Sequence, residues 1–379
     1  MKKILIFSSI GGGGHASTVQ SLRTCLDDTY EIKSVATFQD VLRPVDFINN
    51  YFGGKYSGVK LYNYFLQKNK LFLCNIFSTI GRFFLRHKNK SIIQALQAYL
   101  DTEKPDVIIS VVPLVNYHIL VTAQNLNIPF LIIPSDIDIT QYVADFQSFI
   151  YNKIYVALPF ENGIDTKRFA AIGVPENNMC VAGASIRASF LQPKNTQELK
   201  EKWHIATSDP VVLVMVGAQG SQSAVLYCQQ LTKVKKDVHV LVCIGKSALL
   251  KESIQAIVFP AHIKIQIIGF TQDIDELMAI ADILVTKPGP NTICEALYST
   301  LPILLDGTST SLIGERYNYN FVAQHGFGEI LTDIDGVAQR IDYLLSRPEI
   351  ISSMKNCMIN FKKKNSQHEI PALIARILK

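Results

Sequence analysis

The sequence predicts an α/β fold in which two doubly wound parallel sheets face each other across a cleft. Short runs rich in Val, Ile and Leu alternate with helical patterns along the chain, and each half contains a strand-to-helix turn rich in glycine or proline. Apolar, β-branched strands separated by helices are typical of parallel sheets that are covered on both faces. With 379 residues, 48% of them hydrophobic, the chain is long enough for two ordinary domains.

Ten apolar runs are predicted to be strands, at residues 4–9, 31–35, 106–112, 130–134, 153–158, 211–216, 239–244, 264–268, 283–286 and 303–305. Residues 190–195 resemble a linker, so we predict a first domain over 1–190 and a second over 191–359. A charged helix at 196–203 opens the second domain. A last helix, over about 350–378, is predicted to bend near Pro371 and to return to the first domain with residues 360–379.

The first glycine-rich turn follows the opening strand, where Gly11, Gly12, Gly13 and Gly14 precede His15. Four consecutive glycines are costly in backbone entropy, and they are typical of a tight turn that a ligand approaches closely. We expect a helix from near residue 17. The turn lies where open α/β sheets bind ligands, so His15 is a candidate general base. The alternative is a histidine that only caps the helix.

The second turn runs from Lys287 to Asn291 and joins the strand 283–286 to a helix. Pro and Gly produce a sharp turn, and Asn291 or Thr292 is expected to cap the helix. The free N–H groups and the positive end of the helix dipole would then bind an anion such as a diphosphate. Glu295 lies about one turn further on, where its carboxylate would accept hydrogen bonds from a ribose diol. A plain strand-to-helix turn is the alternative.

Composition narrows the class of protein. The net charge of +5 is too small to indicate nucleic-acid binding by itself. The seven cysteines are scattered without a C-x-x-C pair, which predicts reduced thiols, a cytoplasmic protein and no zinc site. Neither a signal peptide nor an apolar run of about 18 residues is visible, so we expect no transmembrane helix.

The region of residues 51–90 has an unusual composition. Between Asp46 and Asp101 there is no acidic residue, and basic residues alternate with many Phe and Tyr residues. Basic residues with Phe and Leu at helical spacing indicate a helix that lies on an anionic membrane surface. Nucleic-acid binding is an alternative, because aromatic side chains stack on bases. A helix packed on the sheet with a solvated basic face is another.

Three motifs in the same order resemble one group of glycosyltransferases: the Gly11–His15 turn, the Val216–Gly220 turn and the Lys287–Ala296 segment. The group comprises monogalactosyldiacylglycerol synthases and processive diacylglycerol glucosyltransferases, and it is related to the N-acetylglucosaminyltransferase of the lipid-linked peptidoglycan precursor. The resemblance implies the GT-B fold, with two Rossmann-like domains. It also implies an inverting, metal-independent transfer of a hexose or N-acetylhexosamine from a UDP-sugar to a lipid acceptor, without a cofactor, by an enzyme bound peripherally to the membrane.

The resemblance also implies the residues of the donor site. Gly289, Pro290, Asn291 and Thr292 would line the diphosphate, and Glu295 would hold the ribose. Glu315 and Asn318 would approach the donor sugar. The remaining donor-binding residues would be Gly217, Gly220, Gly245, Phe270 and Lys287. On the other domain, Gly12, Gly13 and Gly14 would line the acceptor or phosphate side.

On the acceptor side, Asp136 matches the family, and with His15 it forms the predicted catalytic pair. His15 would take the proton of the acceptor, and Asp136 would orient His15 or bind the acceptor. The chain departs from the family at Gly314, Gln141 and Ala144, which replace a glutamine, a histidine and a tryptophan. These departures leave the sugar and the acceptor open. Asp136 and Asp138 also match a metal-binding D-x-D, but the implied mechanism needs no metal.

Two other functions remain open from the sequence. A UDP-N-acetylglucosamine 2-epimerase would bind UDP between two such domains and need no acceptor. A non-catalytic protein that binds a membrane or a partner would explain the departures from the family pattern.

Overall fold

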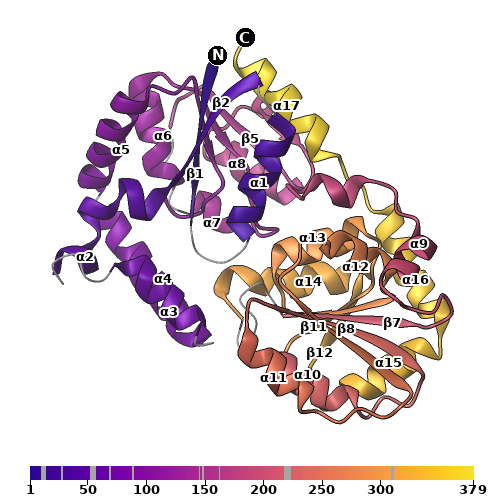
Figure 1. Ribbon diagram of the computed structural model, residues 1–379. Helices are drawn as coiled ribbons and strands as arrows, with labels where there is room; N and C mark the ends of the chain where they lie inside the picture. Colours follow the sequence, from indigo (N-terminus) through magenta and orange to yellow (C-terminus); the bar gives the residue numbers. More distant parts are fainter. Residues whose placement is uncertain are drawn as a thin grey trace. The chain divides into compact units, whose positions relative to one another are not determined.

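A computed structural model of the chain divides into two compact units, Met1–Ala188 together with Lys362–Lys379, and Ser189–Phe361 (Figure 1). It describes residues 1–9, 14–26, 29–51, 57–67, 70–87, 89–144, 146, 149–161, 163–216, 223–308 and 311–379. The expected boundary after residue 190 falls after residue 188 in the structure, and the return to the first unit begins at 362 instead of 360.

The first unit contains a six-stranded parallel sheet in the order β2-β1-β3-β4-β5-β6. Its strands are β1 (Lys2–Ser8), β2 (Tyr30–Ala36), β3 (Val107–Ser110), β4 (Phe130–Ile132), β5 (Ile154–Leu158) and β6 (Met179–Val181). On one face, the core includes side chains of α5 (Asn89–Glu103), α6 (Asn116–Leu126) and α8 (Gly163–Ala171). On the other face, it includes those of α1 (Gly14–Leu26) and α17 (Ser366–Ile377).

Seven further elements among the described residues complete the first unit. They are η2 (Thr37–Val41), η3 (Arg43–Val45), α2 (Phe47–Tyr51), α3 (Gly58–Gln67), α4 (Leu71–His87), α7 (Thr140–Val143) and η4 (Glu176–Asn178). The helices α3 and α4 form a hairpin that projects from this unit beside α2 and α5 (Figure 1).

The second unit repeats the architecture, with strand order β12-β11-β10-β7-β8-β9. Its strands are β7 (Val211–Met215), β8 (Val238–Gly245), β9 (Ile263–Gly269), β10 (Ile283–Thr286), β11 (Ile303–Asp306) and β12 (Gly328–Leu331). One face packs against α10 (Ser223–Leu231), α11 (Ala248–Gln255), α15 (Val337–Leu345) and α16 (Pro348–Asn360). Figure 1 shows α12 (Ile274–Ile280), α13 (Pro290–Tyr298) and α14 (Arg316–Gln324) on the other. The elements η5 (Ala188–Leu191), α9 (Thr196–Lys202) and η6 (Ile313–Glu315) complete the list.

All ten predicted strands are confirmed, and the structure adds the edge strands β6 and β12, which were not predicted. Two predictions about helices need correction. The first helix begins at Gly14 instead of near residue 17, so His15 lies in its first turn. The predicted last helix is two helices separated at 361–365, and Pro371 lies inside α17. The helix is interrupted there because the backbone of Asn365 is extended and its side chain accepts a hydrogen bond from the Gln367 N–H, which caps α17.

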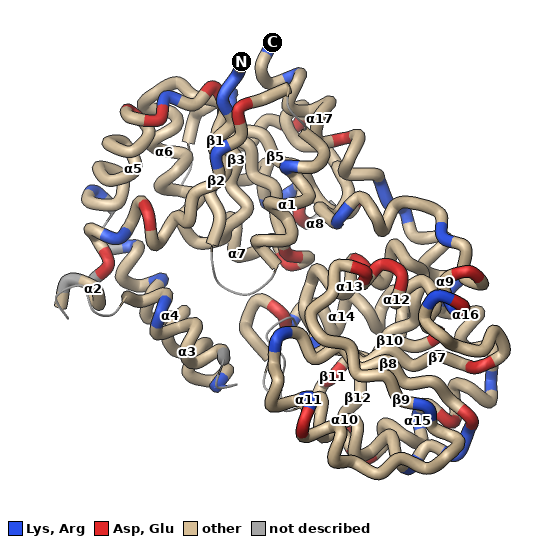
Figure 2. The backbone as a smooth tube through the Cα atoms, in the orientation of Figure 1, with Lys and Arg blue, Asp and Glu red and all other residues tan. Residues whose placement is uncertain are grey.

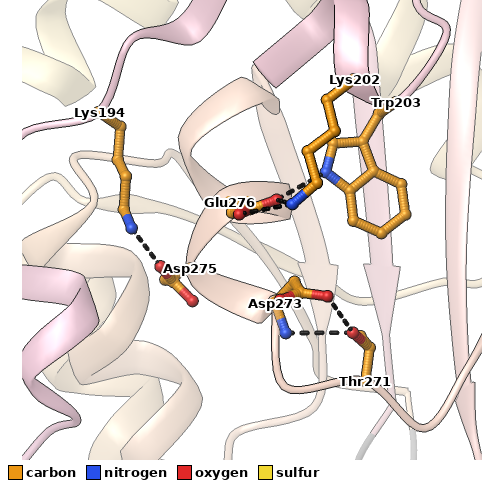
Figure 3. A network of polar contacts seen from close by, with 7 residues as sticks. All are labelled: Lys194, Lys202, Trp203, Thr271, Asp273, Asp275 and Glu276. Carbon is orange, nitrogen blue, oxygen red and sulfur yellow. Dashed lines mark hydrogen bonds and ion pairs between the residues drawn. The ribbon is translucent and has the colours of Figure 1, made fainter. Parts of the chain in front are cut away.

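A polar network connects Lys194, Lys202 and Trp203, near the start of the second unit, with α12 (Figure 3). Lys194 pairs with Asp275, a carboxylate that is 6% exposed. Glu276 accepts hydrogen bonds from Lys202 at 2.6 Å and from the Trp203 indole N–H at 3.1 Å. The segment from Lys194 onward is therefore part of the second unit, and Trp203, the only tryptophan of the chain, reports on the folding of that unit.

His239, on β8, makes the stability of the second unit sensitive to acid. Its side chain is buried, and among the described residues neither ring nitrogen has a hydrogen-bond partner. Burial lowers the pKa of His239 below its ordinary value of 6.5; Lys264 and Lys200 lower it further, and Asp209 opposes them. The unfolded chain therefore binds a proton at this histidine more readily than the folded chain does. The free energy of unfolding consequently has its full value above about pH 6.5 and decreases as the pH falls from there towards the lowered pKa.

We expect the urea midpoint of unfolding, followed by Trp203 fluorescence, to fall less between about pH 7.5 and pH 5.5 in His239→Phe than in the wild type. Phenylalanine keeps the buried ring and removes the titrating nitrogens. The exposed His204 of the same unit provides the control variant His204→Phe, which should retain the wild-type dependence. Equal losses in all three proteins would contradict this account.

Candidate active site

The strand orders create one topological switch point in each unit. In the first sheet, β1 lies between β2 and β3, and the chain leaves β1 in one direction for β2 and later returns to its other side with β3. In the second sheet, β7 lies between β8 and β10 in the same way. Open α/β sheets bind ligands beyond the carboxyl ends of the strands at such points. The two glycine-rich turns predicted from the sequence follow β1 and β10, so both reach a switch point.

His15 is held at the first switch point by the segment that follows β3. Its Nδ1 lies 3.0 Å from the carbonyl oxygen of Val111 and 2.9 Å from the Ser135 hydroxyl, which follows β4. A carbonyl oxygen only accepts hydrogen bonds, so Nδ1 carries the hydrogen. The lone pair of the neutral imidazole is then on Nε2, the nitrogen that can act as a base.

Asp136 is connected to this histidine through Tyr142, a residue that the sequence did not reveal. The buried Tyr142 hydroxyl donates to Asp136 Oδ2 at 2.9 Å and lies 3.0 Å from the Ser135 hydroxyl. Burial raises the pKa of Asp136, while the nearby His15 and the hydrogen bond from Tyr142 act in the opposite direction. Burial also raises the pKa of Tyr142 well above its usual value, so the phenol stays protonated. The structure thus joins the two predicted catalytic residues in one network.

The second aspartate of the D-x-D pattern has a different structural role. Asp138 Oδ1 accepts a hydrogen bond from the Thr140 N–H at 2.9 Å and so supports the start of α7. In the described part of the chain, no group of three or more His, Cys, Asp or Glu side chains could hold a metal ion. Of the positions that depart from the family pattern, Gln141 lies in α7 and Ala144 is an exposed residue directly after it.

At the second switch point, α13 begins at Pro290 and Gly289 is its N-cap. The prediction that Asn291 or Thr292 caps this helix is wrong, because the sharp turn starts the helix earlier and no side chain caps it. Asn291 and Thr292 instead occupy the first turn, where backbone N–H groups have no acceptor within the helix. Thr286 on β10 donates to the Met215 carbonyl on β7 at 2.6 Å and ties the two strand ends together.

Asn318, on α14, supports the turn between β10 and α13 through a hydrogen bond to its backbone. Its fully buried side chain donates a 2.7 Å hydrogen bond from Nδ2 to the carbonyl oxygen of Pro288. It therefore supports the residue next to Gly289, and its predicted approach to the donor sugar stays a prediction. Glu295 is 7% exposed on α13, whereas Glu315 and Gly314 are half-buried in η6.

Two further predicted donor residues meet at the carboxyl ends of β8 and β9. Gly245 ends β8 with a φ of 60°, and Phe270 follows β9 with 56% of its surface exposed. The ammonium of Lys246 lies 4.8 Å from the centre of the Phe270 ring. Lys287 is half-buried beside Gly289. Of the other predicted site residues, Gly14 begins α1, while Gly12, Gly13, Gly217 and Gly220 lie outside the described residues.

Residues 211–370 match the glycosyltransferase family 28 C-terminal domain. A processive diacylglycerol beta-glucosyltransferase of Bacillus subtilis is 24% identical over 388 residues, which cover 97% of this chain and 94% of the relative. Among solved structures, Acinetobacter baumannii MurG has a TM-score of 0.64 at 15% identity and covers 99% of this chain and 100% of its own. The UDP-GlcNAc 2-epimerase of Neisseria meningitidis bound to UDP-GlcNAc has a TM-score of 0.57 at 14% identity, covering 100% and 98%.

The matched domain contains the β10–α13 turn and every described donor residue predicted from the sequence. The likeness to MurG extends over both units and shows a shared fold. The chain is therefore a glycosyltransferase of the two-domain GT-B fold, and its second unit carries a glycosyltransferase family 28 C-terminal domain.

Proposed function

We propose that this chain transfers a hexose or N-acetylhexosamine from a UDP-sugar to a lipid acceptor at a membrane surface, with inversion and without a metal ion. The observation that carries the proposal is the turn at the second switch point, where Asn318 holds the backbone before Gly289 and α13 begins without a side-chain cap. The first-turn N–H groups and the helix dipole favour an anion at this end of α13. The diphosphate of a UDP-sugar is the anion we propose for this turn, and the UDP-GlcNAc bound to the structural neighbour from Neisseria meningitidis supports it.

In the proposed reaction, the acceptor oxygen attacks the anomeric carbon while the bond from that carbon to the UDP oxygen breaks. Nε2 of His15 takes the proton of the acceptor hydroxyl. The charge that grows on the leaving diphosphate is stabilised by the amides and dipole of α13, so the leaving group needs no metal. A single displacement inverts the anomeric configuration.

A lipid acceptor is supported by the α4 apolar face, which we define as Phe72, Ile76, Ile80, Phe83 and Phe84. These side chains recur every three or four residues along α4, and between 37% and 67% of each is exposed. The opposite face of α4 carries the buried Cys74 and Leu85, which packs on the core of the first unit. Figure 2 shows basic positions and no acidic one along α3 and α4. An exposed apolar stripe among basic residues suits an anionic lipid surface.

Along the described residues, no helix has both the length and the apolar character needed to cross a bilayer. We therefore propose peripheral attachment through α4. The diacylglycerol named in the relative from Bacillus subtilis is the first acceptor to test.

The experiment that tests the function measures UDP release from UDP-glucose, UDP-galactose and UDP-N-acetylglucosamine, with and without vesicles that contain diacylglycerol and anionic phospholipid. Transfer should require vesicles, persist in EDTA and give a β-linked product. Isomerisation of a UDP-sugar without any acceptor would instead identify an epimerase, and the absence of UDP release with every donor would refute the proposal.

Gly289→Ala is expected to weaken UDP binding about tenfold, or about 1.4 kcal/mol, with little loss of stability. The backbone at Gly289 has a φ of −73°, and an added Cβ would meet only Lys287 Cε at 3.8 Å, so the free protein tolerates alanine. A diphosphate close to the backbone would meet the new methyl group. Titration calorimetry with UDP measures the change.

The matched control is Gly336→Ala, because Gly336 is also a helix N-cap, with φ −79° and space for a Cβ, but on α15 after the edge strand β12. It should retain the UDP affinity of the wild type. Equal affinities for Gly289→Ala and the wild type would show that no diphosphate lies against this turn.

A further inference from the structure

A hydrogen-bonded chain of three side chains leads from Asp136 to His15. The Tyr142 hydroxyl lies 2.9 Å from Asp136 Oδ2 and 3.0 Å from Ser135 Oγ, and Ser135 Oγ lies 2.9 Å from His15 Nδ1. The backbone N–H of Ser135 donates to the same Tyr142 oxygen at 3.0 Å. Tyr142 is 1% exposed, so protein groups fix its hydroxyl.

Both ends of this chain define the direction of its hydrogen bonds. A carboxylate oxygen only accepts, so the Tyr142 hydroxyl donates to Asp136. Two acceptors lie near the Ser135 hydroxyl, the Tyr142 oxygen at 3.0 Å and the Val111 carbonyl oxygen at 3.2 Å, and we take the nearer Tyr142 oxygen as the acceptor. Ser135 Oγ consequently presents a lone pair to His15 Nδ1, which also faces the Val111 carbonyl at 3.0 Å, and the two acceptors together favour a hydrogen on Nδ1. With these donors, the hydrogen bonds between the three side chains point towards Asp136, and the Val111 carbonyl lies beside all three donors, at 3.0 Å from His15 Nδ1 and 3.2 Å from the Ser135 and Tyr142 hydroxyls.

We propose that Tyr142 is a positioning residue for the base His15: its hydroxyl directs the Ser135 hydrogen away from Nδ1 and relays the charge of Asp136 to the imidazole. The catalytic part of this inference rests on the function proposed above. When Nε2 takes a proton, the imidazolium keeps its Nδ1–H on Val111 and Ser135, and the aligned dipoles of the chain stabilise the new charge.

The electrostatic surroundings agree with this arrangement. His15 and the Tyr142 hydrogen bond both lower the pKa of Asp136 against the effect of burial, and Asp138 raises it. The carboxylate and the imidazole are therefore coupled, although no direct hydrogen bond joins them among the contacts of the described residues. Without the phenol, Asp136 would lose the donor that holds its charged form beside the histidine.

Tyr142→Phe should lower kcat roughly tenfold to 100-fold, the range for losing a hydrogen bond to a charged group. The KM for the UDP-sugar should stay within about twofold, since the donor site lies in the other unit. The matched control is Tyr151→Phe, which removes another buried phenol of the first unit, one that donates to the Ile128 carbonyl at 2.7 Å. Tyr151→Phe should keep the wild-type kcat, and a kcat within about twofold of wild type for Tyr142→Phe would overturn the proposal.

A second measurement does not depend on activity. Nitrogen-15 NMR of histidine-labelled protein distinguishes the two neutral tautomers, and His15→Gln identifies the signals of His15 among eight histidines. The wild type and Tyr151→Phe should show the Nδ1–H tautomer. Tyr142→Phe should show an added Nε2–H fraction, because the Ser135 hydroxyl, no longer drawn to the Tyr142 oxygen, can donate to Nδ1 and so compete with the Nδ1–H that faces the Val111 carbonyl. An unchanged tautomer in Tyr142→Phe overturns the positioning role even if the wild type transfers sugar. A changed tautomer supports it even if the wild type proves inactive.

Discussion

Replacement of His15 by alanine is expected to lower kcat by about 10²- to 10⁴-fold, the usual contribution of a general base, while the affinity for UDP stays unchanged. The reason is the local geometry. The Val111 carbonyl and Ser135 Oγ both lie beside Nδ1 and favour a hydrogen there, so the imidazole offers Nε2 as its basic nitrogen. UDP is proposed to bind at α13 in the other unit, and its affinity should not depend on this side chain.

Steady-state kinetics with vesicles and titration calorimetry with UDP separate the two effects in His15→Ala. His368→Ala is the control, because it removes an exposed histidine from α17 of the same unit. It should retain both the rate and the affinity of the wild type. If His15→Ala kept more than about half of the wild-type kcat, another group would have to take the proton.

The strands that the sequence predicted correctly are those whose local signal is strong. The residues Ile4–Phe7 of β1 are fully buried, and such continuous apolar runs are typical of a parallel sheet covered on both faces. β6 is only three residues long and lies at the edge of its sheet, so its signal is weak. β12 begins at a glycine that reduces strand propensity, yet any Cβ at Gly328 would collide with the backbone of Ile303. Tertiary packing, not local preference, selects that residue.

The candidate site shows a similar limit. His15 and Gly289 were predictable because glycine-rich turns after strands have a known geometry. The part played by Tyr142 could not be predicted, since it depends on the strand order that places the ends of β1, β3 and β4 side by side. Hydrophobic periodicity identifies strands but not their neighbours. The capping of α13 was predicted wrongly for a related reason: Asn and Thr are favoured caps, but the Pro-Gly-Pro turn had already started the helix.

The other large effect is expected on the α4 apolar face. The double variant Phe72→Ser/Phe83→Ser should reduce binding to anionic vesicles by at least about 100-fold, because burying each Phe contributes roughly 1.5–3 kcal/mol. Both side chains are more than half exposed, so their replacement should leave the fold intact. Vesicle co-sedimentation measures the binding, and titration calorimetry should show an unchanged affinity for UDP.

The control for this variant removes exposed apolar side chains elsewhere. Leu249→Ser/Val258→Ser changes two residues of the second unit that are 63% and 89% exposed, and it should bind vesicles as the wild type does. The basic residues around α4 add an electrostatic term of about 1 kcal/mol each, so binding of the wild type should also weaken as salt is added. In Phe72→Ser/Phe83→Ser, only this salt-sensitive part of the binding should remain. If the double variant bound vesicles as tightly as the wild type, or if RNA displaced the wild type from them, α4 would not be the membrane-binding element. The exposed aromatic residues would then need a nucleic acid or a protein partner to explain them.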